Sequence, residues 1–354
     1  MLTERKKLSF KDIIDGIGIP TLIIAAFFAL ILVIAHFYDL SVVTLLSDTV
    51  KRAGMNGLLV LAMLPSIQSG TGPNFALPIG VECGLFAMVL AIEWGFTGWG
   101  WFGVSVALSI VFAIFVGWAY GKLLNAVKGS EMTIATYAGF AICSFMCIFW
   151  LMLPFKSPNM GWFIGQGLRE TIQLDAVGAD MILNNLLGFW IGEEFYVPTG
   201  MLLFFFLCCF LVWLFFRSKS GIAISAVGSS NAFAEASGLN VNKNRVLANI
   251  ISTILGAIGI IVFSQSYGYL QIYTAHLNIA FAAVAGILIG GATASRAKVS
   301  HVIIGVFLFQ GLLTSALPVA NQIFAGTDLS EIMRMIIQNG FILYALTQVK
   351  KGGK

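Results

Sequence analysis

Residues 218–259 read SKSGIAISAVGSSNAFAEASGLNVNKNRVLANIISTILGAIG, a long polar interruption between two apolar runs. The Ser-Ser-Asn triplet at 229–231 offers side-chain oxygens that can cap a helix N-terminus. Residues 232–237 are mostly helix formers, and Gly238 can take the left-handed conformation that ends a helix. A helix of about two turns is unstable alone, because isolated helices need roughly 12 residues. We therefore expect it to sit in a groove of another protein, with Phe233 as its only bulky apolar side chain.

The composition of the chain is that of an integral membrane protein. Hydrophobic residues make up 58% of the 354 residues and charged residues only 10%, whereas soluble domains carry roughly 25% charge. The apolar runs are continuous, which favours helices over the alternating segments of a membrane barrel. The 38 glycines suit close helix packing in lipid. The sequence therefore predicts one all-α domain embedded in the bilayer, without a second, soluble domain.

Runs of about 20 apolar residues are long enough to cross a bilayer, and they predict ten transmembrane helices. In chain order these cover residues 19–37, 55–68, 75–94, 101–121, 133–154, 197–216, 246–266, 277–294, 299–319 and 333–349. Basic residues gather in cytoplasmic loops. With both termini in the cytoplasm, only five of the 20 basic residues lie outside, namely Lys51, Arg52, Lys156, Arg169 and Arg334. The charge distribution therefore supports ten spans.

The segment 65–82, PSIQSGTGPNFALPIGVE, places three prolines and three glycines within an apolar region. Such residues survive at membrane depth only where they are buried in protein or face a wet cavity, and broken helices form the solute sites of many transporters. The alternative is a tight cytoplasmic turn between two unbroken spans. A carboxylate within a span costs about 2.5 to 3.5 kcal/mol and normally faces the bundle interior, as we expect for Glu82.

We predict a substrate pathway from the polar residues of the spans. Its members are Gln68, Asn74, Glu82, Gln265, Ser266 and Gln310. The alternative role for each is a helix-to-helix hydrogen bond, worth about 0.6 kcal/mol. A polar path with few charges suits a neutral, hydroxyl-rich solute. A monosaccharide is the leading candidate, and a nucleoside follows closely.

The pattern G-x-A-x-x-A-V-G-x-x-x-A-x-x-x-x-S-G-x-x-V resembles the cytoplasmic coupling loop of ATP-binding-cassette (ABC) importer permeases. It is carried by Gly221, Ala223, Ala226, Val227, Gly228, Ala232, Ser237, Gly238 and Val241. The similar branch serves ribose, other monosaccharides, nucleosides and branched-chain amino acids. Gly80-Val81-Glu82 resembles its G-x-E element, and residues 289–293 resemble its G-G-(T/S/A) element. The acidic residue that precedes L-S-x-G in the sugar permeases is absent.

This resemblance implies that the loop 217–245 docks on cytoplasmic ATP-binding subunits. The residues expected to couple to the ATPase are Gly228, Ser230, Asn231, Phe233, Glu235, Ser237 and Gly238. The alternative is an ordinary capped loop between two spans. The resemblance also implies a second permease, either a copy of this chain or a different one, and an extracytoplasmic solute-binding protein. An acidic outer loop at 156–196 is a candidate surface for that protein, or is simply solvated.

The resemblance also sets the expected domain organisation, in the cytoplasmic (inner) membrane of a bacterium. Residues 1–18 form a cytoplasmic amphipathic segment, residues 19–349 the transmembrane permease domain, and residues 350–354 a cytoplasmic tail. Glycine-rich breaks near 70–80 and 286–291 occupy comparable places in the two halves, so we expect an inverted repeat. We expect the lipid bilayer, and no nucleic acid, as a partner.

The chain lacks the residues for its own ATP chemistry or for enzymatic catalysis. No G-x-x-x-x-G-K-[ST] loop is present, so ATP is expected to be bound by the partner subunit and no cofactor by this one. His36, His276 and His301 fall near span ends and are expected at the membrane interface. Cys143 and Cys147 share a helix face, but without a nearby His or Asp in the sequence we expect no metal site. A stand-alone secondary carrier with Glu82 as a proton or cation site remains the alternative function.

Overall fold

The computed structural model describes residues 19–162 and 167–323, together with isolated positions between 332 and 347. The predicted tenth span at 333–349, the segment 1–18 and the tail 350–354 lie outside the two continuous stretches.

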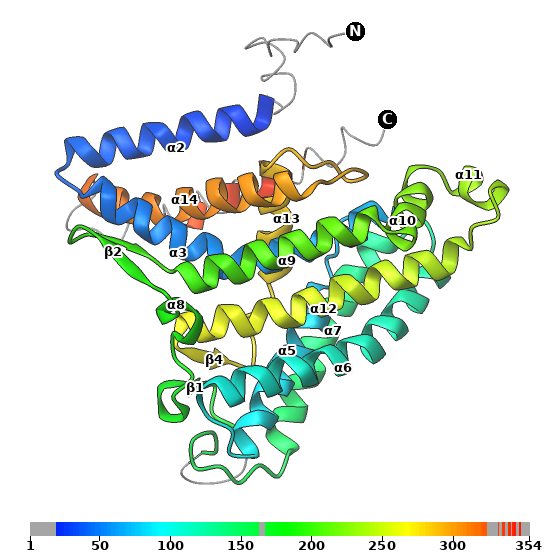
Figure 1. Ribbon diagram of the computed structural model, residues 1–354, viewed down its shortest axis with the longest axis horizontal. Helices are drawn as coiled ribbons and strands as arrows, with labels where there is room; N and C mark the ends of the chain where they lie inside the picture. Colours follow the sequence, from blue (N-terminus) through cyan, green and yellow to red (C-terminus); the bar gives the residue numbers. More distant parts are fainter. Residues whose placement is uncertain are drawn as a thin grey trace, which may run out of the picture.

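Helices form most of the described structure (Figure 1). In chain order the elements are α2 (Ile19–Phe37), α3 (Val42–Leu61), α4 (Met63–Gln68), α5 (Leu77–Glu93), α6 (Gly98–Ala126), α7 (Glu131–Met152), β1 (Thr171–Gln173), the 3-10 helix η1 (Asp175–Val177), α8 (Ile182–Asn185), β2 (Phe189–Ile191), β3 (Phe195–Val197), α9 (Thr199–Arg217), α10 (Lys219–Ser229), α11 (Asn231–Ala236), α12 (Val241–Tyr267), β4 (Tyr269–Gln271), α13 (Ile279–Ile289) and α14 (Val299–Ile323). Two short antiparallel pairs, β1 with β4 and β2 with β3, are the sheets found in the described part. The all-α prediction is confirmed.

Six of these helices, α2, α6, α7, α9, α12 and α14, are long and apolar enough to cross a membrane. Large apolar side chains on them point outward, such as Phe115 on α6 and Ile148 on α7, which are 69% and 61% exposed. Side chains of this kind lose nothing in contact with lipid tails. The chain is a multi-pass membrane protein.

Each of the first nine predicted spans overlaps helical structure, but not every one is a single full span, and the second, 55–68, covers the end of α3 and all of α4. The eighth is the 11-residue α13, which lies across the long helices in Figure 1. The second begins at Val42 rather than Met55, so Lys51 and Arg52 lie within a helix and not in an outer loop. Hydropathy does not mark the start of α3, because Asp48, Lys51 and Arg52 lower the hydropathy of this part of the helix.

The central helix of the bundle is α12, which packs against α3, α5 and α6. Glycines allow its backbone to come close to α5. A Cβ added at Gly80 would lie 2.5 Å from the carbonyl oxygen of Thr253, and one added at Gly84 would lie 2.4 Å from that of Ala257. Small residues at such contacts let helices associate in lipid through close packing.

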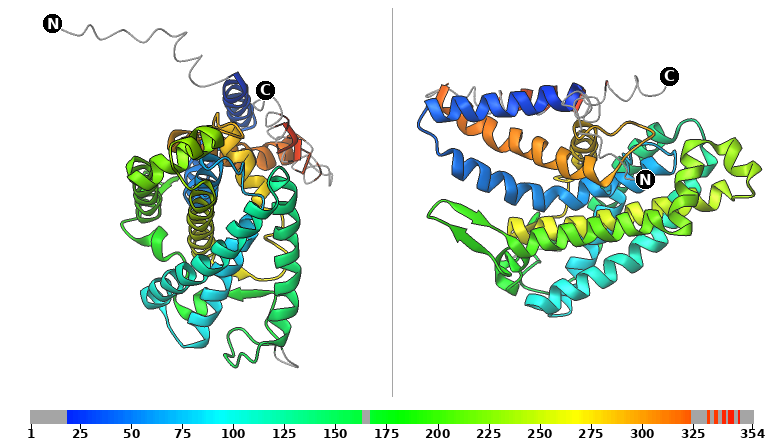
Figure 2. Two further views of the ribbon diagram at one scale, coloured as in Figure 1. Left: turned by 90° about the vertical axis from the view of Figure 1, so that its right-hand side faces the viewer. Right: turned by 45° about the horizontal axis from the view of Figure 1, so that its top comes forward.

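The long helices run between two ends of the molecule (Figures 1 and 2). One carries α10, α11 and the start of α12, and we call it the α11 end. The other carries β1 to β4 and α8, and we call it the strand end. At the α11 end an ion pair joins Arg245 of α12 to Glu131 at the start of α7.

Candidate functional site

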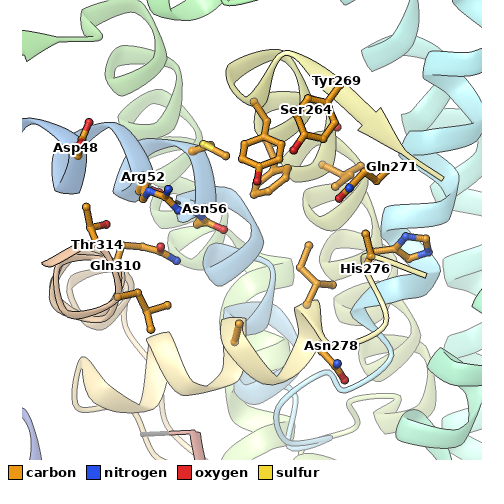
Figure 3. Close-up of a pocket in the computed structure, with 18 of the residues that line it drawn as sticks. Asp48, Arg52, Asn56, Ser264, Tyr269, Gln271, His276, Asn278, Gln310 and Thr314 are labelled. Atoms are coloured by element: carbon orange, nitrogen blue, oxygen red, sulfur yellow. Dashed lines mark hydrogen bonds between the residues drawn. The ribbon is translucent and has the colours of Figure 1, made fainter. Parts of the chain in front are cut away.

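A polar cavity of about 730 Å³ lies among α3, the last turns of α12, β4, α13 and α14. Figure 3 shows side chains from these elements around one space. Its polar lining comprises Asp48, Arg52, Asn56, Ser264, Tyr267, Tyr269, Gln271, His276, Asn278, Gln310 and Thr314. The volume is in the range of sites for small molecules. Polar side chains are costly in contact with lipid, and here they face a shared space inside an apolar bundle.

Three of the lining residues, Asp48, Arg52 and Asn56, follow one another at intervals of four on α3. This spacing places them on one helix face. Asp48 and Arg52 are exposed, and within the described residues neither has an ion-pair partner. As far as the described residues show, the cavity therefore offers a carboxylate and a guanidinium that are not paired with each other or with another charge. The interval of four is visible in the sequence, but the charged residues predict an outer loop there, and the structure corrects this to a helix.

Among the six predicted pathway residues, Gln310 is the one that lines this cavity. Gln265 and Ser266 instead hold α8 against the end of α12. The backbone N–H of Leu183 donates to Oε1 of Gln265 at 3.1 Å, and Nε2 of Gln265 donates to Oδ1 of Asn184 at 3.1 Å. The amide of Asn184 donates to Ser266 Oγ at 2.8 Å. These two residues make the helix-to-helix hydrogen bonds given above as their alternative role.

Asn74 is buried in a network that joins the helix break to three helices. Its Nδ2 donates to Ser252 Oγ at 2.8 Å, and the hydroxyl of Tyr120 donates to its Oδ1 at 3.0 Å. Ser252 in turn donates to the carbonyl of Ala62 at 2.6 Å. Gln68 donates from Nε2 to the carbonyl of Ala297. In this conformation both residues stabilise the break rather than face the cavity.

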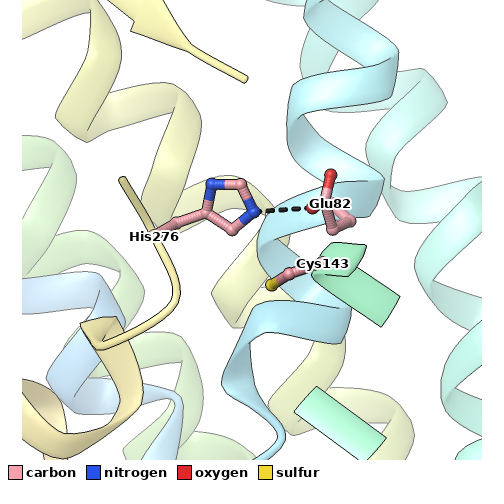
Figure 4. A group of neighbouring side chains, drawn as sticks. All are labelled: Glu82, Cys143 and His276. Carbon is pink, nitrogen blue, oxygen red and sulfur yellow. Dashed lines mark hydrogen bonds and ion pairs between the residues drawn. The ribbon is translucent and has the colours of Figure 1, made fainter. Parts of the chain in front are cut away.

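Glu82 is buried and pairs with His276. The distance from its Oε1 to Nε2 of His276 is 2.6 Å, and both side chains are 3% exposed. The burial of His276 corrects the expectation that it lies at the membrane interface. Cys143 points into the same place (Figure 4), so the lack of a His near Cys143 in the sequence was no guide to its surroundings. His276 also lines the cavity, so this cluster adjoins the cavity.

The predicted short helix is present as α11, shifted by one residue from the expected 232–237. Ser230 caps it by accepting a hydrogen bond from the backbone N–H of Phe233, and Gly238 follows with a φ of 76°. Ala234 packs into a small cluster with Val227. The rest of the helix faces outward, including Asn231, Glu235 and Ser237, and Phe233 is 64% exposed.

The end of α10 touches the break between α4 and α5 through backbone atoms. A Cβ added at Gly228 would lie 2.1 Å from the carbonyl oxygen of Gln68, and one added at Gly70 would lie 3.0 Å from Cα of Gly228. Gly70 has a φ of 77°, a conformation that favours glycine. The turn that follows α4 is therefore in direct contact with the segment that carries α11.

A comparison with family models matches residues 45–346 to the permease component of branched-chain amino acid transport systems. Among solved structures, a protein assigned to the metal-chelate type of ABC transporter, in an inward-facing conformation, is similar at 13% identity and a TM-score of 0.46. The similarity covers 95% of this chain and 99% of that one. No curated protein matches the chain significantly. The family match covers most of the sequence, including the cavity and α11, and agrees with the resemblance drawn from residues 221–241. The chain belongs to the family of branched-chain amino acid transport permeases, as a permease subunit of an ABC importer.

Proposed function

We propose that this permease moves a small neutral polar solute through the cavity between α3, α12, α13 and α14, and that the solute is a monosaccharide. The cavity, about 730 Å³ with amide and hydroxyl groups on several sides, carries this proposal. Amides and hydroxyls both donate and accept hydrogen bonds, so they match a solute whose surface is mostly hydroxyl groups. Tyr267 and Tyr269 add aromatic rings against which the apolar face of a sugar, or the base of a nucleoside, can pack.

A branched-chain amino acid is the second candidate, and the side chains of Asp48 and Arg52 favour it. An amino acid carries an ammonium and a carboxylate close together. A carboxylate and a guanidinium one helical turn apart provide a partner for each, and a guanidinium binds a carboxylate with two parallel hydrogen bonds. The same two side chains also bind sugar hydroxyls, so the charge pair does not exclude the first candidate.

We further propose that α11 docks on the ATP-binding subunit, which places the α11 end in the cytoplasm. The helix is too short to be stable alone and is held by Ala234 while Phe233 faces outward. The residues that would transmit movement are the exposed ones on α11 and the contact between Gly228 and the turn after α4. On this proposal the strand end receives a solute-binding protein, a second permease completes the path, and the complex resides in a bacterial inner membrane with both termini of this chain in the cytoplasm.

Uptake by the complete importer in proteoliposomes tests the choice of solute. The vesicles would contain this permease, its partner permease and the ATP-binding subunits, with binding protein outside and ATP inside. Labelled monosaccharides, nucleosides and branched-chain amino acids are supplied in turn. We expect uptake of a monosaccharide that depends on ATP and falls in Arg52→Ala. Uptake of only an amino acid would favour the second candidate, and uptake by this chain alone without nucleotide would show a secondary carrier instead.

A pair of phenylalanine variants tests the docking of α11. Phe233→Ala removes the exposed side chain of α11, whereas Phe115→Ala removes an equally exposed phenylalanine from the middle of α6. We expect Phe233→Ala to weaken co-purification of the ATP-binding subunit about 10-fold or more, as for an aromatic anchor in a protein interface. Phe115→Ala should leave it unchanged. Equal retention of the ATP-binding subunit by both variants would argue against docking at α11.

A further inference from the structure

We propose that Glu82, Cys143 and His276 form a site for one divalent transition-metal ion, with Zn²⁺ as the best fit, in the wall of the cavity. One carboxylate oxygen, one sulfur and one ring nitrogen lie within 4.8 Å of one another, and all three residues are buried. They come from α5, α7 and the loop between β4 and α13. Figure 4 shows the three side chains converging on one place.

The three donor types are those that zinc binds in proteins. Zinc takes thiolate, imidazole and carboxylate ligands with bonds of about 2.0 to 2.3 Å, which places ligands of a tetrahedral ion roughly 3.5 Å apart. The present distance between Glu82 Oε1 and His276 Nε2 is 2.6 Å, so this hydrogen bond opens by about 1 Å when an ion enters. On binding, the thiol of Cys143 releases its proton to solvent, and the proton of His276 resides on Nδ1.

The charge of such a site is balanced, which matters at this depth in the bundle. Two positive charges on the ion are offset by the carboxylate of Glu82 and the thiolate of Cys143, while His276 is neutral. A neutral cluster avoids most of the penalty of burying an isolated charge. Harder ions such as Mg²⁺ and Ca²⁺ prefer oxygen ligands, so a single carboxylate beside sulfur and nitrogen favours zinc over them.

A plain hydrogen bond between Glu82 and His276 explains these side chains less completely. It leaves Oε2 of Glu82 buried without a hydrogen-bond partner within the described structure, and unpaired buried polar groups are costly. It also gives Cys143 no role. A bound ion uses Cys143 and can take both oxygens of the carboxylate.

An ion can reach the site from the cavity, because His276 lines both. Three protein ligands leave one tetrahedral position for water or another small ligand. Once bound, the ion joins α5 and α7 to the loop that leads into α13. Occupancy would therefore stiffen one wall of the cavity, whichever solute the importer carries.

Metal titration of the full-length permease in detergent tests the site. After removal of metal with a chelator, Co²⁺ is added and the thiolate-to-cobalt charge-transfer absorption is recorded, followed by displacement with Zn²⁺ and elemental analysis. We expect about one ion per chain and a charge-transfer band that Zn²⁺ removes. Cys143→Ser should abolish the band and weaken Zn²⁺ binding more than about 10-fold.

Cys208→Ser is the matched control, because Cys208 is a buried cysteine on α9 outside the cluster. It should keep the band and the bound ion. The proposal is overturned if the folded wild-type chain shows no thiolate-to-cobalt band. It is also overturned if the band persists in Cys143→Ser. If Cys143→Ser fails to fold, Cys143→Ala replaces it, and the wild-type titration still decides whether a thiolate binds the ion.

Discussion

Replacing Gly228 by alanine tests the mechanical contact between the segment that carries α11 and the helix break. Gly228 lies in the last turn of α10. Its added Cβ would lie 2.1 Å from the carbonyl oxygen and 2.8 Å from the carbonyl carbon of Gln68, and 2.9 Å from the backbone nitrogen of Gly70. All three are backbone atoms, so no side chain can rotate away. The two segments would have to separate by roughly 1 Å to restore ordinary contact.

The expected change in packing free energy for Gly228→Ala is the difference between two opposing effects. Alanine is favoured over glycine by about 1 kcal/mol within a helix. Overpacking a tight contact costs about 1 to 3 kcal/mol, occasionally more, and a clash with backbone belongs at the upper end of that range. We expect a net loss of about 1 to 2 kcal/mol in the packing of α10 on the break, which corresponds to a 5- to 30-fold change in the population of the docked arrangement.

Two measurements on the reconstituted importer read out this loss. Gly228→Ala should lower the thermal midpoint by a few degrees and lower the amount of solute taken up per ATP hydrolysed. Gly103→Ala is the matched control, since Gly103 is a helical glycine on α6 with no atom within 4 Å of an added Cβ. It should be neutral or slightly stabilising. Wild-type stability and wild-type uptake per ATP in Gly228→Ala would refute the reasoning.

Three further predictions concern residues that line the cavity, form buried hydrogen bonds or form a buried ion pair. Gln310→Ala should raise the KM for uptake about 2- to 10-fold, the effect of one lost hydrogen bond, with an unchanged thermal midpoint, whereas Gln265→Ala should leave the KM unchanged and lower the midpoint. Asn74→Leu should destabilise the permease by about 1 to 3 kcal/mol, because it leaves buried partners unpaired, as thermal unfolding in detergent would show. Glu131→Gln should also lower the thermal midpoint, because it leaves Arg245 buried without its ion-pair partner; an unchanged midpoint would contradict this.

Local signals in the sequence predict most of the helices and the bounds of the short helix α11. Long apolar runs predict eight helices in order, namely α2, α5, α6, α7, α9, α12, α13 and α14. A capping serine with a following glycine predicts α11 to within one residue. The same measure of hydropathy failed for α3, because Asp48 and Arg52 made a helix resemble a loop. Both side chains line the cavity, so a hydropathy scale for transfer into lipid does not apply to them.

The composition of the site depended on contacts that the sequence does not encode locally. Glu82 and His276 are 194 positions apart in the chain, and their meeting follows from how the loop before α13 folds over α5. A polar residue in a span was correctly expected to face the interior. Whether it faces a neighbouring helix, as Gln265 does, or the cavity, as Gln310 does, depends on helix rotation, which the spacing of residues alone does not determine.

The shortness of α13 bears on what must cover the chain on either side of it. Its 11 residues extend about 16 Å, roughly half of the ~30 Å hydrocarbon thickness of a bilayer, and the helix lies across the long helices rather than along them (Figure 1). α13 therefore cannot cross a bilayer by itself, and the non-helical backbone at its ends needs partners other than lipid. Such backbone is stable at membrane depth only where it is buried in protein or lines a cavity. Asn278 and Ile279 at the start of α13 line the cavity, so the polar backbone at this end of the helix is kept away from lipid.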